Sequence, residues 1–339
     1  MPKLTLRFAD GDAAEVAVRS DESLLAAARR AGISLASDCE VGDCQTCRAR
    51  IVSGEAVYDE YATISLTQDE VDAGEVLTCV ATAEDDIAVQ LPYERAHLLP
   101  AKPFTLKVVS TKRLCDSVMR LSVLGTGRSP LAFLPGQYVN LKVPGTDQPR
   151  SYSMANAPGV DGASEFLVRL LDDGVMSRYL MDRLAPGDVI NANGPFGTFY
   201  LRASGKPVLM VAGGTGIAPM ASMLRTMIAR QDQRPVILCF GVTTPADLFY
   251  LDELEVLAKQ LANFELRVAI MKGDAGPHVS GVVTDLISRG DVTGRDIYLC
   301  GPPAMTDRAK AILSDHGADQ SCTFVERFVP VAAPELSAV

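Results

Sequence analysis

Four cysteines in the first quarter of the sequence have the spacing of an iron–sulfur site. Cys39, Cys44 and Cys47 form a C-x4-C-x2-C run, and Cys79 follows after 31 residues. One loop can place three thiolates around a two-iron, two-sulfur cluster while a distant fourth thiolate completes the set. Gly42 lies where this loop must bend and direct amide groups at sulfur. A structural zinc ion also suits four thiolates, but zinc sites usually pair two C-x2-C units, so the spacing favours the cluster.

Two short motifs in the middle of the chain have the residue types that bind a flavin. They are RSYS at 150–153 and GVMS at 174–177. Arginine offers a forked donor for pyrophosphate, tyrosine a flat face for an aromatic ring, and serine a hydroxyl group for a ring nitrogen. Glycine and serine at a helix start add backbone N–H donors for phosphate. RSYS alone equally describes surface and core residues of a strand, so the candidates depend on both motifs: Arg150, Ser151, Tyr152, Ser153, Gly174, Met176 and Ser177.

A glycine-rich turn and a Cys-Gly-Pro-Pro motif predict a dinucleotide site. The apolar segment at 208–212 runs into GGTG and then into a helix, so the backbone can approach a diphosphate at the helix start. The second motif, at 300–303, ends a later strand, where open α/β sheets bind ligands. Each motif alone could be an ordinary strand-to-helix turn. The candidates are Gly213, Gly214, Thr215, Gly216, Cys300, Gly301 and Pro302.

The segment GVTTPADLFY, at 241–250, indicates which nicotinamide coenzyme is used. It contains no lysine or arginine to pair with a 2′-phosphate. Its Asp247 would repel such a phosphate or accept hydrogen bonds from ribose hydroxyl groups. The segment therefore favours NADH over NADPH.

The elements that must position these motifs fall into three blocks. We predict domains over 1–92, 104–203 and 204–328, joined by a linker at 93–103 and followed by a tail at 329–339. Three prolines without periodicity at 91–103 mark the linker. The middle block has short β-rich runs between Gly, Pro and Asp turns, which predicts an antiparallel barrel. The third block alternates apolar strands with helices, which predicts a doubly wound parallel sheet.

Local patterns predict individual elements within the blocks. Alternating residues predict strands at 3–8 and 13–18, followed by a helix that Ser20 caps and Gly32 ends. A short helix is expected near 176–184 in the middle block. Three further cysteines have no ligand spacing and are expected in the core: Cys115, Cys239 and Cys322.

Charge and composition exclude several functions. Apolar residues make up 47% and charged residues 22% of the 339 residues, as in globular proteins. Residues 1–100 carry 8 Lys/Arg and 19 Asp/Glu, so the whole net excess of negative charge lies in the first hundred residues. This charge argues against nucleic acid and anionic membranes as partners and favours a basic protein surface. No 18-residue apolar run or signal-peptide pattern occurs, so we expect a cytoplasmic protein.

The motifs resemble two known families. Residues 3–92 resemble plant-type ferredoxins of the β-grasp fold, which implies that the four spaced cysteines ligate the cluster. The sequence departs from that pattern at Glu40, often basic in relatives, and at Gln45, often a small residue. Residues 104–328 resemble the ferredoxin–NADP reductase superfamily, which implies an FAD-binding barrel and a nicotinamide-binding domain.

The second resemblance also implies roles for individual residues. It places Arg150 on the pyrophosphate, Tyr152 against the flavin and Ser153 near the reactive nitrogen. Met176 and Ser177 would lie on the phosphates, with Thr215 and Cys300 beside the nicotinamide ring. Glu326 and Phe328 resemble the closing motif of the superfamily, in which an acid lies near the hydride path and an aromatic ring shields the flavin. Phe328 could instead be an ordinary core anchor. The implied catalytic residues are Ser153, Cys300 and Glu326.

The whole chain resembles the reductase components of benzoate and anthranilate dioxygenase systems. This implies a monomeric enzyme that passes electrons from NADH through FAD and the cluster to a terminal oxygenase of the Rieske type. Alternatives with the same domain order are reductases of diiron monooxygenases, such as phenol or methane hydroxylase, and reductases acting on deoxysugar nucleotides. An alternative of another class is a redox-sensing or partner-binding protein that retains the cofactors.

Overall fold

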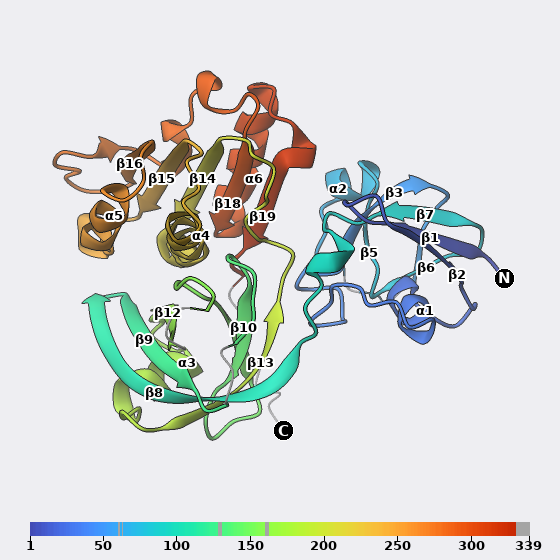
Figure 1. Cartoon of the computed structure of the whole chain (residues 1–339), viewed down its shortest axis with the longest axis horizontal. Coiled ribbons are helices and arrows are strands. Elements are labelled where there is room, and N and C mark those ends of the chain that lie inside the picture. The colour runs from blue at the N-terminus through green and yellow to red at the C-terminus, as the bar shows by residue number, and fades with distance from the viewer. Residues whose placement is uncertain (60–61, 63, 128–130, 160–162, 330–339) are drawn as a thin grey trace. The chain divides into compact units, whose positions relative to one another are not determined.

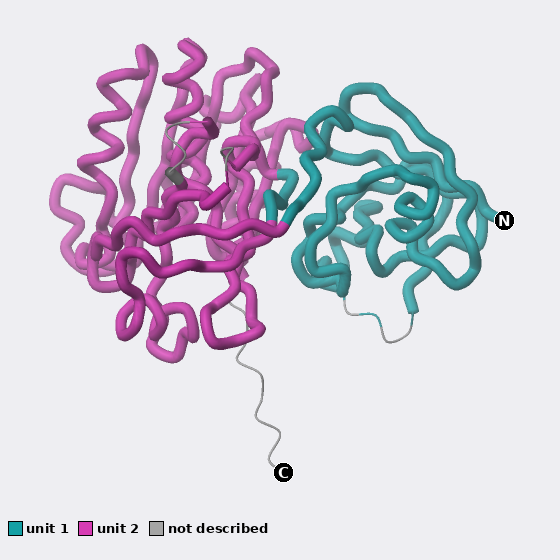
Figure 2. The backbone as a smooth tube through the Cα atoms, turned by 60° about the horizontal axis from the view of Figure 1, so that its bottom comes forward, with its two compact units in different colours: residues 1–102, 194–198 teal, residues 103–193, 199–339 magenta. Residues whose placement is uncertain are grey.

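The computed structural model describes residues 1–59, 62, 64–127, 131–159 and 163–329, which belong to two compact units. Unit 1 comprises residues 1–102 and 194–198, and unit 2 the remainder (Figure 2). Unit 1 contains the predicted cluster domain. Unit 2 contains both the predicted barrel and the predicted nicotinamide domain. These two do not separate because one hydrophobic cluster joins Val118 and Leu167 of the barrel to Met210 and Met220.

Unit 1 is built on a five-stranded mixed sheet in the order β2-β1-β7-β3-β5 (Figure 1). β1 pairs antiparallel with β2 and parallel with β7, and helix α1 buries Leu24, Leu25, Ala27 and Ala28. The elements are β1 (Lys3–Arg7), β2 (Ala13–Ala17), α1 (Leu24–Arg30), β3 (Arg48–Ser53), β4 (Val57–Tyr58), α2 (Gln68–Asp72), β5 (Glu75–Leu77), β6 (Ala81–Thr82), β7 (Ile87–Gln90) and η1 (Arg95–His97).

Two local predictions for unit 1 differ from the structure. The cap of α1 is Ser23, whose side chain accepts a hydrogen bond from the amide of Ala26, so the predicted cap at Ser20 is wrong. Gly32 follows the helix with φ 74°, as its predicted role as a helix stop requires. Tyr93, placed at the start of the linker, is 2% exposed, and its hydroxyl group accepts a hydrogen bond from the amide of Ala36. Tyr93 is therefore part of the unit 1 core.

The first half of unit 2 is a barrel around its own apolar core. Its strands follow the order β11-β10-β13-β8-β9-β12, and an antiparallel bridge between Met154 and Phe166 joins the two ends. The registers of β8 with β9, β9 with β12 and β10 with β11 are antiparallel. The elements are β8 (Lys102–Cys115), β9 (Val118–Gly125), β10 (Tyr138–Lys142), β11 (Pro149–Ser153), β12 (Ala163–Arg169), α3 (Val175–Asp182) and β13 (Val189–Phe196).

The second half of unit 2 has a parallel sheet in the order β17-β16-β15-β14-β18-β19, which confirms the predicted doubly wound α/β fold. The order reverses between β14 and β18, the place where such sheets bind ligands. The elements are β14 (Val208–Gly213), η2 (Gly214–Gly216), α4 (Ile217–Ala229), β15 (Val236–Val242), η3 (Pro245–Asp247), α5 (Leu251–Ala258), β16 (Phe264–Ile270), β17 (Val279–Ser280), η4 (Val283–Leu286), η5 (Arg289–Asp291), β18 (Asp296–Gly301), α6 (Pro303–Asp315), η6 (Gln320–Cys322) and β19 (Thr323–Arg327).

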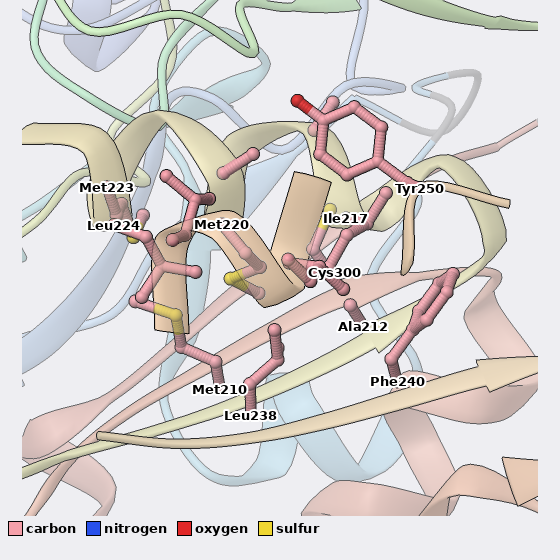
Figure 3. Packing of buried hydrophobic residues seen from close by; sticks show 14 of the residues in the cluster. Met210, Ala212, Ile217, Met220, Met223, Leu224, Leu238, Phe240, Tyr250 and Cys300 are labelled. Carbon is pink, nitrogen blue, oxygen red and sulfur yellow. The ribbon is translucent and has the colours of Figure 1, made fainter. Parts of the chain in front are cut away.

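Side chains of β14 alternate between two cores, one on each face of this sheet. Met210 and Ala212 pack against α4, together with Leu238 and Phe240 of β15 (Figure 3). Leu209 and Val211 point to the opposite core, which α6 and η4 cover. A sheet covered on both faces explains why its strands are continuous apolar runs. Among the described residues, no helix is both long enough and apolar enough to cross a bilayer.

Candidate functional site

The three predicted catalytic residues lie together in unit 2, although they come from three strands. Ser153 ends β11, and Cys300 and Glu326 are directly paired partners in β18 and β19. The hydroxyl group of Ser153 donates a hydrogen bond of 3.0 Å to Oε2 of Glu326, and the Cys300 sulfur lies 4.0 Å from the same oxygen. The barrel and the parallel sheet therefore each supply part of one constellation.

Burial keeps these side chains uncharged near neutral pH. It raises the pKa of Glu326 to about 8, although the hydrogen bond from Ser153 opposes the rise. Burial, with a smaller contribution from the Glu326 carboxylate, also holds the pKa of the Cys300 thiol well above its ordinary value. A neutral, partly dehydrated site suits hydride transfer, which depends on orientation and exclusion of water more than on a charged base.

Strand β11 presents the predicted flavin-binding residues. The guanidinium group of Arg150 donates only to uncharged oxygens, the Pro149 carbonyl and Gln148 Oε1, both at 2.8 Å. Arg150 forms no ion pair within the described part of the chain, so its charge is available to a diphosphate. The ring of Tyr152 packs edge-on against Phe166, with centroids 6.5 Å apart. Ser151 Oγ donates to Asn140 Oδ1 at 2.7 Å, which links β11 to β10.

Helix α3 contains the second flavin motif. It begins after Gly174 without a side-chain cap, so its first amide groups are available to phosphate. Ser177 Oγ accepts a hydrogen bond from the amide of Leu171, and a Cβ atom on Gly174 would lie 2.6 Å from that oxygen. Met176 is buried in the barrel core. Both side chains thus have structural contacts, and their role at the phosphates stays a prediction.

The glycine-rich turn after β14 lies against the Cys-Gly-Pro-Pro segment. A Cβ atom on Gly216 would come 2.2 Å from the carbonyl oxygen of Cys300, and one on Gly213 would come 2.6 Å from Met305 Sδ. Helix α4 then begins without a side-chain cap, which leaves amide donors for a diphosphate. Open space surrounds the Cβ position of Gly214. The residues fit a dinucleotide, and Met305, which sequence reasoning missed, lies close to both Gly213 and Gly301.

Asp247 lies in the loop after β15, but its carboxylate contacts other protein groups. Oδ1 accepts a hydrogen bond of 2.7 Å from the Ser117 hydroxyl group, and Oδ2 accepts from the amide and hydroxyl groups of Thr244. Burial opposes ionisation of Asp247, but these hydrogen bonds and nearby Arg169 hold its pKa below the ordinary value. Asp247 thus links the parallel sheet to the barrel. Its contact with a ribose stays a prediction.

Phe328 is the last of the predicted cofactor residues. Its amide donates a hydrogen bond of 2.9 Å to the carbonyl oxygen of Gly301, directly after the β18–β19 pairing. Its partly buried ring packs against the core shared by the barrel and the sheet. This contact is the one expected of a core anchor, so shielding of the flavin stays a prediction.

The cysteine loop of unit 1 directs amide groups at sulfur. The amides of Val41 and Cys44 donate to Cys39 Sγ at 3.5 and 3.3 Å, and the amide of Cys39 donates to Cys44 Sγ at 3.5 Å. Positive φ angles at Glu40, Gly42 and Gln45 wind the backbone inward. Such donors stabilise iron-bound thiolates, so the loop fits a two-iron cluster held by the four spaced cysteines.

Polar contacts stabilise the two unusual positions of this loop. Glu40 forms an ion pair with Arg29, whose hydrogen bond lowers the pKa of the carboxyl group. Gln45 Nε2 donates to the carbonyl oxygen of Ser65 at 2.8 Å, and Gln45 Oε1 accepts from Arg48. In the described residues, no three His, Cys, Asp or Glu side chains are arranged to hold one metal ion.

Comparison with known proteins agrees with this geometry. Three family models match in order: a 2Fe-2S iron-sulfur cluster binding domain at 8–84, an oxidoreductase FAD-binding domain at 105–200 and an oxidoreductase NAD-binding domain at 210–311. The toluate 1,2-dioxygenase electron transfer component of Pseudomonas putida is 35% identical over 97% of this chain and 99% of its own. The chain belongs to this family of electron transfer components.

Other electron transfer components serve different oxygenases. The reductase component of propane 2-monooxygenase from Rhodococcus jostii is 32% identical over 94% of this chain and 90% of its own. Among solved structures, the cytochrome P450 reductase GcoB from Amycolatopsis has a TM-score of 0.73 at 29% identity and covers 96% of this chain and 99% of its own. The predicted cofactors, FAD, a 2Fe-2S cluster and NAD, are confirmed by the matching domains.

Proposed function

We propose that this electron transfer component oxidises NADH and delivers the electrons, through FAD and the two-iron cluster, to the Rieske-type terminal oxygenase of an aromatic ring-hydroxylating dioxygenase. The observation that carries the first step is the convergence of Ser153, Cys300 and Glu326 between the flavin strand β11 and the carboxyl ends of β18 and β19. Hydride transfer would need the flavin and nicotinamide rings close together, and these three residues would lie next to both rings.

The chain's own residues have distinct tasks in this reaction. When bound, FAD would supply the conversion of a two-electron hydride into the single electrons that a cluster needs. Ser153 and the neutral carboxyl of Glu326 orient and hydrogen-bond the reacting rings, while the buried Cys300 fills the space beside them and excludes water. Arg150 and the open helix starts of α3 and α4 bind the two diphosphates.

Charge and similarity support an oxygenase partner. The excess of acidic residues in the first hundred residues favours docking to a basic protein surface and disfavours nucleic acid and anionic membranes. The toluate and 2-halobenzoate dioxygenase components, at 35% and 34% identity, match nearly the whole chain. We further propose a cytoplasmic monomer, a state that suits a carrier which must bind and leave its partner and in which all eight cysteines are free thiols or cluster ligands.

Two measurements test this proposal in sequence. Anaerobic titration of the purified protein with NADH should bleach the flavin and produce the rhombic electron spin resonance signal of a reduced two-iron cluster. Mixing with purified aromatic dioxygenase components should then give NADH consumption that depends on both the oxygenase and its aromatic substrate. Flavin bleaching without a cluster signal, in protein shown to contain iron, would contradict the proposed electron route.

A second candidate partner is a monooxygenase. Three propane 2-monooxygenase reductase components are 32–34% identical to this chain over 93–94% of its length. In the same assay, NADH consumption coupled to a hydrocarbon monooxygenase and absent with aromatic dioxygenases would select this candidate. Slow reduction of ferricyanide by NADH would instead favour the redox-sensing alternative.

A further inference from the structure

Lys206 and Cys322 form a close pair at the amino ends of the strands in the parallel sheet. Lys206 lies two residues before β14, and Cys322 immediately precedes the edge strand β19. This end of the sheet is opposite the carboxyl ends that hold Cys300 and Glu326. Cys322 was expected in the core, but it is only partly buried, so small oxidants can reach it.

The contact between the two side chains is unusually short. Lys206 Nζ lies 2.8 Å from Cys322 Sγ, whereas the N–H groups around Cys39 and Cys44 lie 3.3 to 3.5 Å from sulfur. The lysine contacts sulfur although carboxylates lie nearby, and no ion pair of Lys206 is found in the described part of the chain. An oxygen atom bonded to both Nζ and Sγ would span about this distance.

A carboxylate completes the group. The Cys322 thiol lies 3.5 Å from Oδ2 of Asp319 and can donate its hydrogen there. The other oxygen, Oδ1, accepts hydrogen bonds from the amide and hydroxyl groups of Ser321, at 2.9 and 2.7 Å, which fix the carboxylate. Asp319 and Lys206 thus contact the same sulfur atom, and the thiolate is the form that reacts with peroxide.

We propose that Lys206 and Cys322 form a reversible covalent link, made on oxidation, in which one oxygen atom joins Nζ to Sγ. Hydrogen peroxide is the oxidant. One molecule converts the thiol to a sulfenic acid. The hydrogen bond with Cys322 raises the pKa of Lys206, so its ammonium group first loses a proton to solvent, and a second peroxide molecule converts the resulting amine to a hydroxylamine. Each oxidation breaks an O–O bond, removes two electrons and releases water. Condensation of the two hydroxyl groups leaves nitrogen–oxygen–sulfur and releases a third water. Thiol reductants reverse the link.

The link would stabilise the strand that carries Glu326. β19 is an edge strand and pairs only with β18. The link joins residues 116 positions apart and closes a long loop in the unfolded chain. Loops of this length give crosslinks a large effect on stability, so oxidation should raise the Tm by about 5 °C or more. This inference does not depend on the proposed electron acceptor.

Peptide mass spectrometry of the full-length, cofactor-loaded protein tests the link. After mild peroxide treatment, proteolysis should yield one species containing both Lys206 and Cys322, heavier than the two unmodified peptides together by about 14 Da, the mass of one oxygen less two hydrogens. Dithiothreitol should restore the separate peptides and the lower Tm. Cys322 that stays reduced, or that becomes sulfenic or sulfinic acid without Lys206, would overturn the inference.

Matched variants separate the link from general oxidation. Cys322→Ser and Lys206→Arg should each abolish the joined species and the rise in Tm. Cys322→Ser removes the sulfur, and Lys206→Arg keeps the positive charge but replaces the amino group by a guanidinium group. Cys115→Ser is the control, since Cys115 is also partly buried but has no lysine contact, and it should retain both effects. A joined species or an oxidation-dependent rise in Tm in Lys206→Arg would refute the inference.

Discussion

The hydroxyl group of Ser153 donates a hydrogen bond of 3.0 Å to the carboxyl group of Glu326, although 173 residues separate them in the chain. One residue belongs to the barrel and the other to the edge strand of the parallel sheet. Their contact fixes where β11 of the barrel meets the edge of the parallel sheet. The predictions for Ser153 and Glu326 depend on this contact.

Removing the Ser153 hydroxyl group should slow hydride transfer. Ser153→Ala deletes both the contact with Glu326 and a donor near the reacting atoms, so NADH-dependent flavin reduction should fall about 100-fold, the usual effect of losing one donor at a reacting centre. Flavin content should be unchanged. Stopped-flow absorbance measures the rate, and Ser110→Ala, on an exposed part of β8, is the control. A rate within twofold of the wild type would contradict a catalytic role.

The ionisation of Glu326 should control the pH dependence of the same step. Because burial raises the pKa of this carboxyl group to about 8, the group is neutral at pH 7 and becomes charged above pH 8. NADH–ferricyanide activity should therefore fall as the pH rises through about 8. Glu326→Gln keeps the neutral form and should lack this decline. Parallel pH profiles in the two proteins would show that another group titrates.

The same pKa predicts a change in stability with a defined sign. The folded-state value of about 8 exceeds the ordinary value of 4.5, so the neutral carboxyl group contributes stability that is complete below pH 4.5. That contribution is lost as the pH rises through about 8. The Tm of the wild type should therefore fall relative to that of Glu326→Gln between about pH 5 and pH 9, which scanning calorimetry can measure.

Cys79 should be needed for cluster assembly but not for flavin reduction. Cys79→Ser removes the distant fourth ligand, so iron content and NADH-dependent cytochrome c reduction should fall to background. NADH–ferricyanide activity should remain, because flavin and NADH bind in unit 2. Cys115→Ser, which removes none of the four predicted cluster cysteines, should retain both activities. Loss of both activities in Cys79→Ser would mean that the two units do not function separately.

The close approach of Gly216 to Cys300 should make any side chain at position 216 harmful. Gly216→Ala places a Cβ atom 2.2 Å from the Cys300 carbonyl oxygen, so the turn must move away from the nicotinamide site. We expect at least a tenfold loss in NADH-dependent flavin reduction, about 1.4 kcal/mol or more of lost transition-state binding. Gly290→Ala has open space around its Cβ position and should behave as the wild type.

Asp247 should affect both stability and coenzyme choice. Losing its bonds to Ser117 and Thr244 in Asp247→Ala should cost about 1–2 kcal/mol of unfolding free energy. Since these bonds depress the pKa of Asp247, their contribution to stability is present above the ordinary pKa of 3.8 and is lost as the pH falls through the lower folded-state value.

Asp247→Arg should improve NADPH use, because a cation can pair with the 2′-phosphate. Unchanged NADPH kinetics would place Asp247 away from the ribose.

A double-mutant cycle can separate the two roles of Asp247. Ser117→Ala and Asp247→Ala each break the 2.7 Å bond between the barrel and the parallel sheet. Their effects on unfolding free energy should be less than additive, because either change removes the same interaction. Full additivity would mean that this bond contributes nothing measurable.

Much of the fold followed from short-range patterns in the sequence. Spacing identified the four cysteines because one loop must supply three ligands, and apolar runs identified β14, β15 and β18 because a sheet covered on both faces needs them. Glycines at 213, 214 and 216 marked the predicted dinucleotide turn, and at position 216 only glycine permits the approach to Cys300. The helix cap at Ser23 was missed because Ser20 lies nearby and has the same local propensity.

Tertiary structure alone decided which distant groups meet. No local signal connects Ser117 with Asp247, Ser153 with Glu326, or Lys206 with Cys322, because each pair is more than 100 residues apart and is joined by the packing of whole elements. The same packing merges the predicted barrel and nicotinamide domains into unit 2, since they share a buried core. Local sequence determined the elements and ligand types, whereas long-range burial determined the contacts and the raised pKa of Glu326.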